Sequence, residues 1–448
     1  MNGNSLAAAT FTRRGLLGMG AVGAAIGLVG CSSSGTPTPA SSSTGAPALT
    51  DATKALTVAL WGDAVRAKLY QSAIDLYKTK NPDTALTLQY ADLTAYLERL
   101  ATQAAASSLP DVFFMRDTHI SRYGSSGVLL NLEPYLNNGI DKTGIGDDGV
   151  FSGKLKNGVF ALPTHYVGSA VIYDETALKT AGVNYANDVK TWDDLAAAAK
   201  EVSGKGFYGI ADPTIGSTHN HFESYVRQAG GEVYNADGTE AGFKNSVMED
   251  WYAYWDKMRK AGTVPPADVE TEAESAGWTK DLLTTGRAGF RLASTNHLTL
   301  IQNLRPTPLG MDVMPALADG TKDWRFFPPI LMSIAAKTKG GKTSVALMDY
   351  FINSPEAAAL TRLSQGAPSS SKVRDSLLPS LNPQEKRFIE VISSELNQPR
   401  RPAQIRPAGA EAFNKAVTQT GQQIAFGSAS IKDAVANFMS EAKRALKA

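Results

Sequence analysis

The stretch YLERLATQAAASSLPDVFFM, from Tyr96 to Met115, holds a pattern that recurs along the whole chain. Tyr96, Leu97 and Leu100 have the spacing of one helix face, and DVFF at 111–114 is a short apolar run typical of a buried strand. A helix that leads into a buried strand is the repeating unit of α/β proteins. Their ligands bind where the strands end.

The same alternation precedes this stretch. ALTVAL at 55–60 and TALTLQY at 84–90 are predicted strands. Between them Leu69, Ala73 and Leu76 repeat at helical spacing. This order favours a mainly parallel sheet with helices on its faces.

The alternation continues to the end of the chain, without an internal repeat. Further strands are predicted at 158–163, 169–174, 288–293 and 330–336. Helices are predicted at 192–202, 222–229, 245–260, 276–285, 345–352, 355–363, 385–396, 410–424 and 431–446. Single cores stop growing near ~250–300 residues, so 448 residues favour two lobes.

Composition excludes several classes of protein. The chain is 43% hydrophobic and 19% charged, with a net charge of +1, which favours neither a nucleic-acid surface nor a polybasic membrane patch. One cysteine allows no disulfide within the chain and no thiolate metal site.

That cysteine lies in TRRGLLGMGAVGAAIGLVGCSSSG, residues 12–35. A basic pair, a short apolar run and small residues indicate an export signal over residues 1–30. Arg13 and Arg14 resemble a twin-arginine signal, and the residues before Cys31 resemble a bacterial lipobox, which implies lipidation of Cys31. The alternative is an uncleaved anchor with an incidental cysteine. Residues 31–52 are rich in Ser, Thr, Pro, Gly and Ala and are predicted to be a disordered tether.

No motif predicts catalysis, a cofactor or a metal. GGKTS at 340–344 lacks the first glycine of a phosphate loop and is interpreted as a turn before a helix. HExxH and G-x-S-x-G are absent, and no carboxylate pair stands out. His219 and His221 could form half of a metal site, which is weak evidence.

Several segments follow one another in an order known from one family. They are LTVALWGD with LTLQYAD, LERLATQAAASSLPDVFFM with SRYGSSGVLLNLEPYL, GVFALPTHYVGSAVIYDETALKTAGV with TWDDLAAAAK, YVRQAGGEVY, LTTGRAGFRLAS, and IRPAGAEAFNKAV with SIKDAVANFMSEAKRAL. The chain resembles the extracellular solute-binding proteins, family 1, of bacterial ABC importers, in particular the carbohydrate-binding group that includes the maltose-binding protein.

The resemblance implies a two-lobed α/β fold, the periplasmic-binding-protein type II fold, with a hinge and a ligand cleft between the lobes. One lobe would hold 53–165 and 331–380, and the other 166–330 and 381–448. The protein would be a monomer, lipid-anchored to the outer face of the cell membrane, that binds a mono- or oligosaccharide and delivers it to the transmembrane subunits of a permease. It would be neither an enzyme nor a nucleic-acid binder.

A sugar needs a flat aromatic ring for its C–H face and fixed hydrogen-bonding groups for its hydroxyls. Met115 stands where maltose-binding relatives carry a tryptophan. Trp61 could instead be core, Asp63 could cap a helix, and Trp251, Tyr252 and Trp255 are interpreted as packing. The predicted ligand-binding residues follow strands or begin helices: Trp61, Asp63, Asp117, His119, His165, Tyr166, His219, Asn220, His221, Ser294, Thr295, Asn296 and Arg406.

Three alternatives to sugar import stay open. The same fold could bind a metal chelate, a phosphodiester or an amino sugar, or the chain could be a secreted polysaccharide-acting enzyme or an adhesion lipoprotein. If the histidines bind sugar hydroxyls, affinity is expected to fall as the pH drops through ~6.5.

Overall fold

The computed structural model describes residues 48–216 and 219–447. The predicted export signal, Cys31 and the tether up to residue 47 lie outside the described residues. Within the described ranges, no helix combines the length and the apolar character needed to cross a bilayer.

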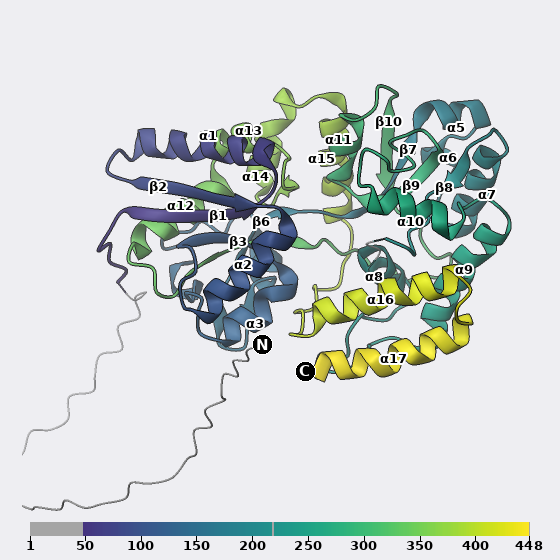
Figure 1. Cartoon of the computed structure of the whole chain (residues 1–448). Helices are drawn as coiled ribbons and strands as arrows, with labels where there is room; N and C mark the ends of the chain where they lie inside the picture. The colour runs from purple at the N-terminus through teal and green to yellow at the C-terminus, as the bar shows by residue number, and fades with distance from the viewer. Residues whose placement is uncertain (1–47, 217–218, 448) are drawn as a thin grey trace, which may run out of the picture. The chain divides into compact units, whose positions relative to one another are not determined.

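Strands and helices alternate along the chain (Figure 1). The strands are β1 (Ala55–Trp61), β2 (Ala85–Ala91), β3 (Val112–Arg116), β4 (Lys154–Leu155), β5 (Gly158–Val159), β6 (Leu162–Tyr166), β7 (Ser169–Asp174), β8 (Tyr208–Ile210), β9 (Ala288–Ser294), β10 (Leu309–Val313), β11 (Pro329–Ile334) and β12 (Ala367–Pro368).

The α-helices are α1 (Ala64–Lys80), α2 (Leu93–Ala105), α3 (Ile120–Ser125), α4 (Gly146–Phe151), α5 (Glu175–Ala181), α6 (Tyr185–Asp188), α7 (Trp192–Ser203), α8 (His219–Gln228), α9 (Asn245–Lys260), α10 (Ala267–Ser275), α11 (His297–Gln302), α12 (Gly341–Asn353), α13 (Pro355–Thr361), α14 (Ser371–Leu377), α15 (Pro383–Leu396), α16 (Ala410–Ala425) and α17 (Ile431–Lys447). Short 3-10 turns are η1 (Asp117–His119), η2 (Glu133–Tyr135) and η3 (Leu378–Ser380).

The first sheet has six strands in the order β12-β6-β11-β3-β1-β2. β1 pairs in parallel with β2 and β3, whereas β11 is antiparallel to both β3 and β6. The expected mainly parallel sheet is therefore wrong beyond β3. The reason is that β6 and β11 connect directly to strands of the other sheet, so they do not follow the strand–helix–strand crossover that makes neighbours parallel.

Aromatic packing fixes the helices on this sheet. In Figure 1, α1 and α13 lie on one side of it, and α2 and α3 lie on the other. From α2, the Tyr96 hydroxyl donates to the carbonyls of Phe114 in β3 (2.7 Å) and Ala59 in β1 (3.3 Å). From α1, the Tyr70 ring packs on Phe114, with ring centroids 5.3 Å apart. The strand ends are thereby held in fixed positions.

The second sheet has the order β10-β7-β9-β8 and carries the larger core. α7 packs on β8 and β9, α15 packs on β10, and α16 and α17 pack on α9. Trp251, Tyr252 and Trp255 of α9 are fully buried in this core, which confirms that they are packing residues.

The chain passes between the two sheets more than once. β6 belongs to the six-stranded sheet and β7 to the four-stranded one, with only Val167 and Gly168 between them. A second passage joins β10 to β11. Thr295 braces the first passage, because its amide donates to the Gly168 carbonyl (2.9 Å) and its hydroxyl accepts from the Gly168 amide (3.1 Å).

Most predicted helices are confirmed within a few residues, and one is wrong. The predicted helix at 276–285 does not form; α10 occupies 267–275 instead. Gly277 follows with a φ of +75°, a left-handed conformation that ends the helix. The interpretation of GGKTS as a turn before a helix is wrong, because Gly340 is the N-cap of α12 and the other four residues of the segment form its first turn.

Candidate functional site

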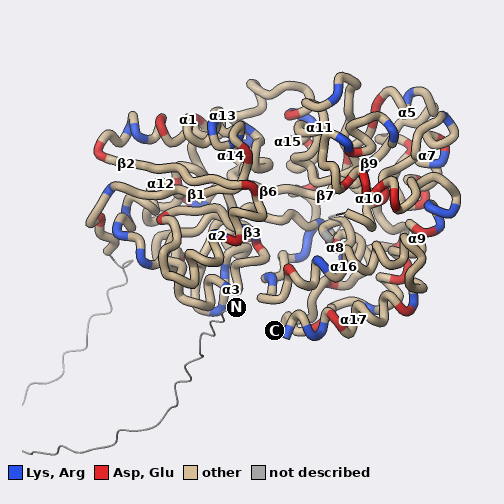
Figure 2. Tube along the Cα trace, viewed as in Figure 1, with Lys and Arg blue, Asp and Glu red and all other residues tan. Residues whose placement is uncertain are grey.

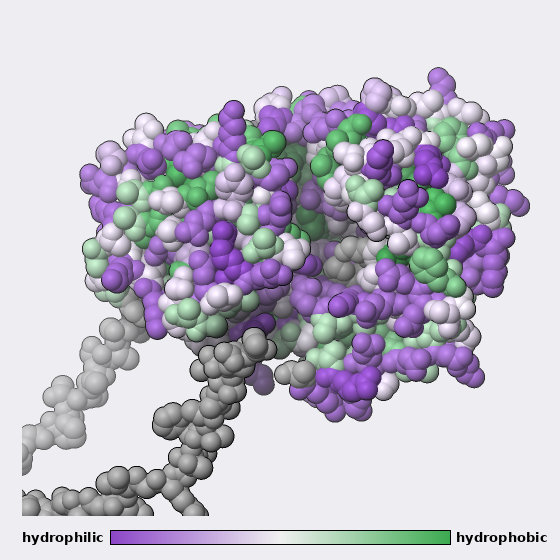
Figure 3. Space-filling model, viewed as in Figure 1, coloured by the Kyte–Doolittle hydropathy of each residue, from purple (hydrophilic) through white to green (hydrophobic). Residues whose placement is uncertain are grey.

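A cavity of about 290 Å³ lies where the end of β1 faces the end of β9 and the start of α8. Figure 3 shows the surface hollowed between the elements of the two sheets. The lining residues come from both sheets and their helices: Trp61, Arg66, Leu93, Arg116, Val167, Asn220, His221, Glu274, Trp278, Arg291, Leu292, Ala293, Ser294, Asn296, His297, Ile330 and Gln365.

Two tryptophans line this cavity, Trp61 from the six-stranded sheet and Trp278 from the part of the chain that holds the four-stranded sheet. Trp61 ends β1 and is 8% exposed, with its ring against Tyr96 (centroids 5.9 Å apart). Trp278 follows α10 and is more exposed, with its ring 4.3 Å from that of His297. Aromatic faces of this kind bind the C–H faces of organic ligands.

Polar groups without a protein partner also line the cavity. Among the described residues, neither Asn296 Oδ1 nor His297 Nδ1 has a hydrogen-bond partner, although both atoms are buried. Buried polar atoms normally find one. A ligand hydroxyl in the cavity could be the hydrogen-bond partner of these two atoms.

The histidines at the cavity are neutral. Burial lowers the pKa of His221 to about 3, and burial together with the nearby Arg291 lowers that of His297 to about 3. His221 Nδ1 lies 3.0 Å from Ser169 Oγ. At these two rings, a loss of affinity through protonation is expected only well below pH 6.5.

One arginine of the cavity carries its own counterions. Arg291 in β9 forms ion pairs with Asp281 and Glu274, and its guanidinium lies 3.6 Å from Glu270. Burial lowers the pKa of Arg291, but the carboxylates of Asp281 and Glu274 outweigh it, and the net shift is upward. Burial raises the pKa of Glu270 to about 8, although the nearby Arg291 acts in the opposite direction.

A second polar cluster joins elements of the two sheets. Arg406 is buried and donates to Asp117 (2.9 Å) in η1 and to Glu223 (2.7 Å) in α8. Burial lowers the pKa of Arg406, but Glu223 and Asp117 outweigh it, and the pKa lies well above its ordinary value. Thr118 donates to Glu411 (2.6 Å) beside this cluster.

The structure brings five of the predicted ligand-binding residues to the cavity: Trp61, Asn220, His221, Ser294 and Asn296. Asp117 and Arg406 meet each other in the cluster just described. His219 begins α8, but its side chain lies outside the described residues.

Four other predicted residues have partners within the chain. Asp63 caps α1 by accepting from the Arg66 amide (2.8 Å), and Thr295 is bound to Gly168. His119 Nδ1 lies 3.0 Å from Thr118 Oγ1, and His165 Nδ1 lies 3.0 Å from Thr164 Oγ1.

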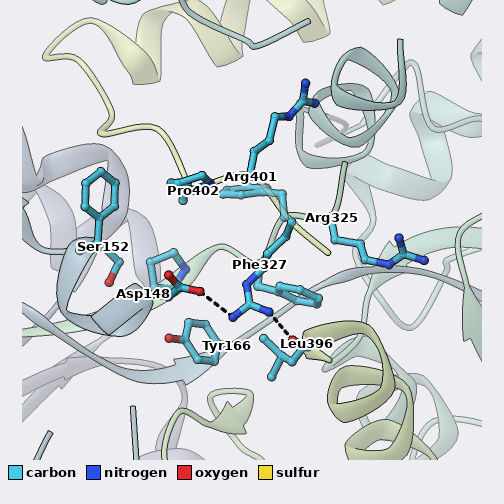
Figure 4. A pocket seen from close by; sticks show the side chains of 13 residues that line it. Asp148, Ser152, Tyr166, Arg325, Phe327, Leu396, Arg401 and Pro402 are labelled. Atoms are coloured by element: carbon cyan, nitrogen blue, oxygen red, sulfur yellow. Dashed lines mark hydrogen bonds and ion pairs between the residues drawn. The ribbon is translucent and has the colours of Figure 1, made fainter. Parts of the chain in front are cut away.

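Tyr166 lies in a smaller cavity of about 50 Å³ (Figure 4). There Arg400 donates to Asp148 (2.9 Å) and to the Leu396 carbonyl, and the Tyr166 ring lies beside this ion pair. Burial raises the pKa of Tyr166 to about 12. The space is too small for a sugar ring.

Sequence reasoning missed seven polar or aromatic residues of the main cavity: Arg66, Arg116, Glu274, Trp278, Arg291, His297 and Gln365. Trp278 was missed because a helix was predicted at 276–285. Gly277, directly before it, is the residue that could have indicated the end of a helix at this point. Arg66 lies in the first turn of α1, beyond the end of β1, and the search for polar residues directly after strands does not find such a position.

Charged residues of both signs occur along the described chain. Basic and acidic residues are interspersed over its elements (Figure 2). No group of three or more His, Cys, Asp or Glu suited to a metal ion occurs in residues 48–216 and 219–447.

The fold and the cavity define a class of protein: two α/β lobes, joined by strands that pass from one sheet to the other, with a polar and aromatic cavity between them. A family model for bacterial extracellular solute-binding proteins matches residues 72–384. The chain therefore belongs to the bacterial extracellular solute-binding protein family, with the two-lobed type II fold of periplasmic binding proteins.

Individual relatives are distant. A curated binding protein from Brucella abortus (strain 2308) is 22% identical over 328 residues, which cover 64% of this chain and 76% of the relative. An extracellular solute-binding protein, family 1, from Alicyclobacillus acidocaldarius is 25% identical, with a TM-score of 0.71, over 88% of this chain and 98% of the solved one.

A third relative was solved with its ligand. A periplasmic oligogalacturonide-binding protein from Yersinia enterocolitica, in complex with saturated digalacturonic acid, is 18% identical. Its TM-score is 0.75, over 88% of this chain and 98% of that chain. This likeness concerns the fold.

Proposed function

We propose that this protein is the substrate-binding lipoprotein of an ABC importer and captures a carbohydrate in the cavity between its lobes. The observation that best supports this proposal is the set of side chains that line the cavity. Trp61 and Trp278 offer rings for sugar faces, and Asn220, Ser294 and Asn296 offer groups for hydroxyls. Its volume of about 290 Å³ suits a small ligand.

Solved neighbours of similar fold support the ligand class. Besides the digalacturonate complex, neighbours were solved with cycloalternan (Listeria monocytogenes) and with α-D-tagatose (Thermotoga lettingae). All three bound molecules are carbohydrates.

The proposed lobes are 53–165 with 331–380, and 166–330 with 381–448. Sheet membership supports this division, because the six-stranded sheet draws on β1–β3, β6, β11 and β12, of which β6 and β11 cross the proposed bounds by one and two residues. Closure of the two lobes would bury the ligand. The protein would act as a monomer.

The proposed anchor is a lipid on Cys31, after export guided by the twin arginines Arg13 and Arg14. A lipid and a tether would keep the lobes at the outer face of the membrane, next to the permease subunits that receive the sugar. Delivery requires no chemistry on the ligand, so we propose that the protein is not an enzyme.

A thermal-shift screen tests this function. The panel holds neutral and acidic sugars, polyols, glycerophosphodiesters and divalent metal ions. A carbohydrate at a hundredfold excess over its Kd should stabilise the fold by about 2.7 kcal/mol, because it binds the folded state alone. Stabilisation by a metal or a glycerophosphodiester, with none by any sugar, would contradict the proposal.

A further inference from the structure

Arg66 is the cation of the cavity that forms no ion pair with a described residue, although the Asp63 carboxylate lies near enough to raise its pKa. Its guanidinium donates to the Trp61 carbonyl (3.2 Å), and its Nε is buried without a partner. The carboxylate of Asp63 contacts the backbone amide of Arg66 and not its guanidinium. Burial lowers the pKa of Arg66, and the nearby Tyr70 and Asp63 offset only part of this shift.

No other described group of the cavity forms an ion pair with the Arg66 guanidinium. Tyr70 lies close enough to interact with Arg66, but burial raises the pKa of the Tyr70 hydroxyl, which stays uncharged. Glu274 lines the same cavity and is held by Arg291. Arg116, the other nearby cation, has Glu411 at 3.4 Å.

Gly62 leaves the space that the Arg66 side chain occupies. Gly62 has a φ of +151°, and a Cβ there would lie 2.6 Å from Arg66 Cδ and 3.1 Å from Arg66 Nη1. The Arg66 side chain therefore folds back over Gly62 at the end of β1, where a larger residue would displace it. This places the guanidinium beside Trp61 at the cavity instead of in solvent.

We propose that the ligand is an acidic sugar and that Arg66 binds its carboxylate in the cavity. This inference rests on the proposed carbohydrate function and narrows the ligand to the uronate class. An arginine forms a paired, charge-assisted contact with a carboxylate. One guanidinium without an ion-pair partner matches one negative charge, which fits a carboxylate better than a phosphate dianion.

The test is calorimetric titration of the protein with matched sugars. The probes are galacturonate and galactose, glucuronate and glucose, the corresponding disaccharides, and galactose 1-phosphate. A uronate should bind about ten- to hundredfold more tightly than its neutral counterpart, since the two differ by one charged contact. Arg66→Gln should abolish that preference, and Arg66→Lys should keep part of it.

A matched control is Lys68→Gln, which removes one positive charge from the exposed side of the same helix. It should leave uronate affinity unchanged within about twofold, since Lys68 does not line the cavity and an exposed charge is screened by water and salt. The ligand-free Arg66→Gln protein should melt no lower than the parent, because an unpaired buried charge has been removed.

The outcomes separate this inference from the proposed function. Equal affinity for uronates and neutral sugars, a preference that survives Arg66→Gln, or tighter binding of galactose 1-phosphate would overturn the inference and leave the carbohydrate function standing. Failure of every sugar in the panel to bind would overturn both.

Discussion

At the scale of single residues, the cavity is defined by groups that the chain leaves available. Trp278 is partly exposed, and its ring packs against His297 and against the Arg291 guanidinium, which lies 5.4 Å from the ring centroid. Asn296 Oδ1 and His297 Nδ1 lie beside it without partners among the described residues. An aromatic face next to unpaired polar atoms is the combination that a sugar ring requires.

Trp278→Ala should weaken sugar binding by about 1–3 kcal/mol, by analogy with the value of base–aromatic stacking. Trp278→Phe is the matched variant and should retain most of the affinity, because a flat ring remains. Calorimetric titration measures both. Unchanged affinity in Trp278→Ala, with the fold intact by circular dichroism, would remove this ring from the site.

Residues also show where sequence reasoning succeeds. Trp61 and Ser294 could be predicted because each ends a strand, and strand ends of a sheet meet at one edge. Arg66 could not be predicted, because its own side chain reaches the cavity only by folding back over Gly62. The pairing of Arg406 with Asp117 and Glu223 joins residues far apart in the chain, which local patterns do not reveal.

At the scale of elements, caps and glycines decide where helices begin and end. α1 begins after Asp63, whose side chain accepts from the amide of Arg66. α7 and α15 begin with full capping boxes, at Thr191 and Asn382. Such signals are local, which is why most helices could be predicted within a few residues. The direction in which strands pair could not be predicted in the same way, because it depends on how the chain connects the two lobes.

Asp63→Ala should lower the free energy of unfolding by about 0.5–2 kcal/mol, because the first turn of α1 loses its cap. Urea denaturation measures this. Asp63→Asn keeps an oxygen acceptor and should recover most of the loss. An equal loss in both variants would show that the negative charge, and not the cap, provides the stabilisation.

At the scale of the whole molecule, buried neutral histidines make the fold sensitive to acid. His165 and His221 are each 5% exposed, and burial lowers the pKa of each to about 3. The unfolded chain takes up their protons near pH ~6.5. Between these values the unfolded state binds more protons, so the free energy of unfolding falls as the pH is lowered.

The loss at about pH 5 relative to about pH 7 should be about 2 kcal/mol for each of these two histidines. Urea denaturation at the two pH values measures it. His221→Gln should be less stable at neutral pH, through its lost contact with Ser169, but should show a smaller pH dependence. A pH dependence identical to that of the parent would mean that His221 is not held neutral.

The anchor is a prediction about the whole molecule and its membrane. Cys31→Ala should move the protein from the membrane fraction to the soluble exported fraction, since a lipid chain is the proposed attachment. Cell fractionation with a salt wash measures this. A variant that stays in the washed membranes would contradict lipidation at Cys31.

The most direct test of the central claim is a crystal structure of the protein with the sugar that binds it most tightly. The account predicts the sugar between Trp61 and Trp278, with hydroxyls on Asn296 and His297 and, for a uronate, the carboxylate on Arg66. A sugar bound elsewhere, for example in the 510 Å³ cavity lined by Asp111 and Lys337, would contradict it.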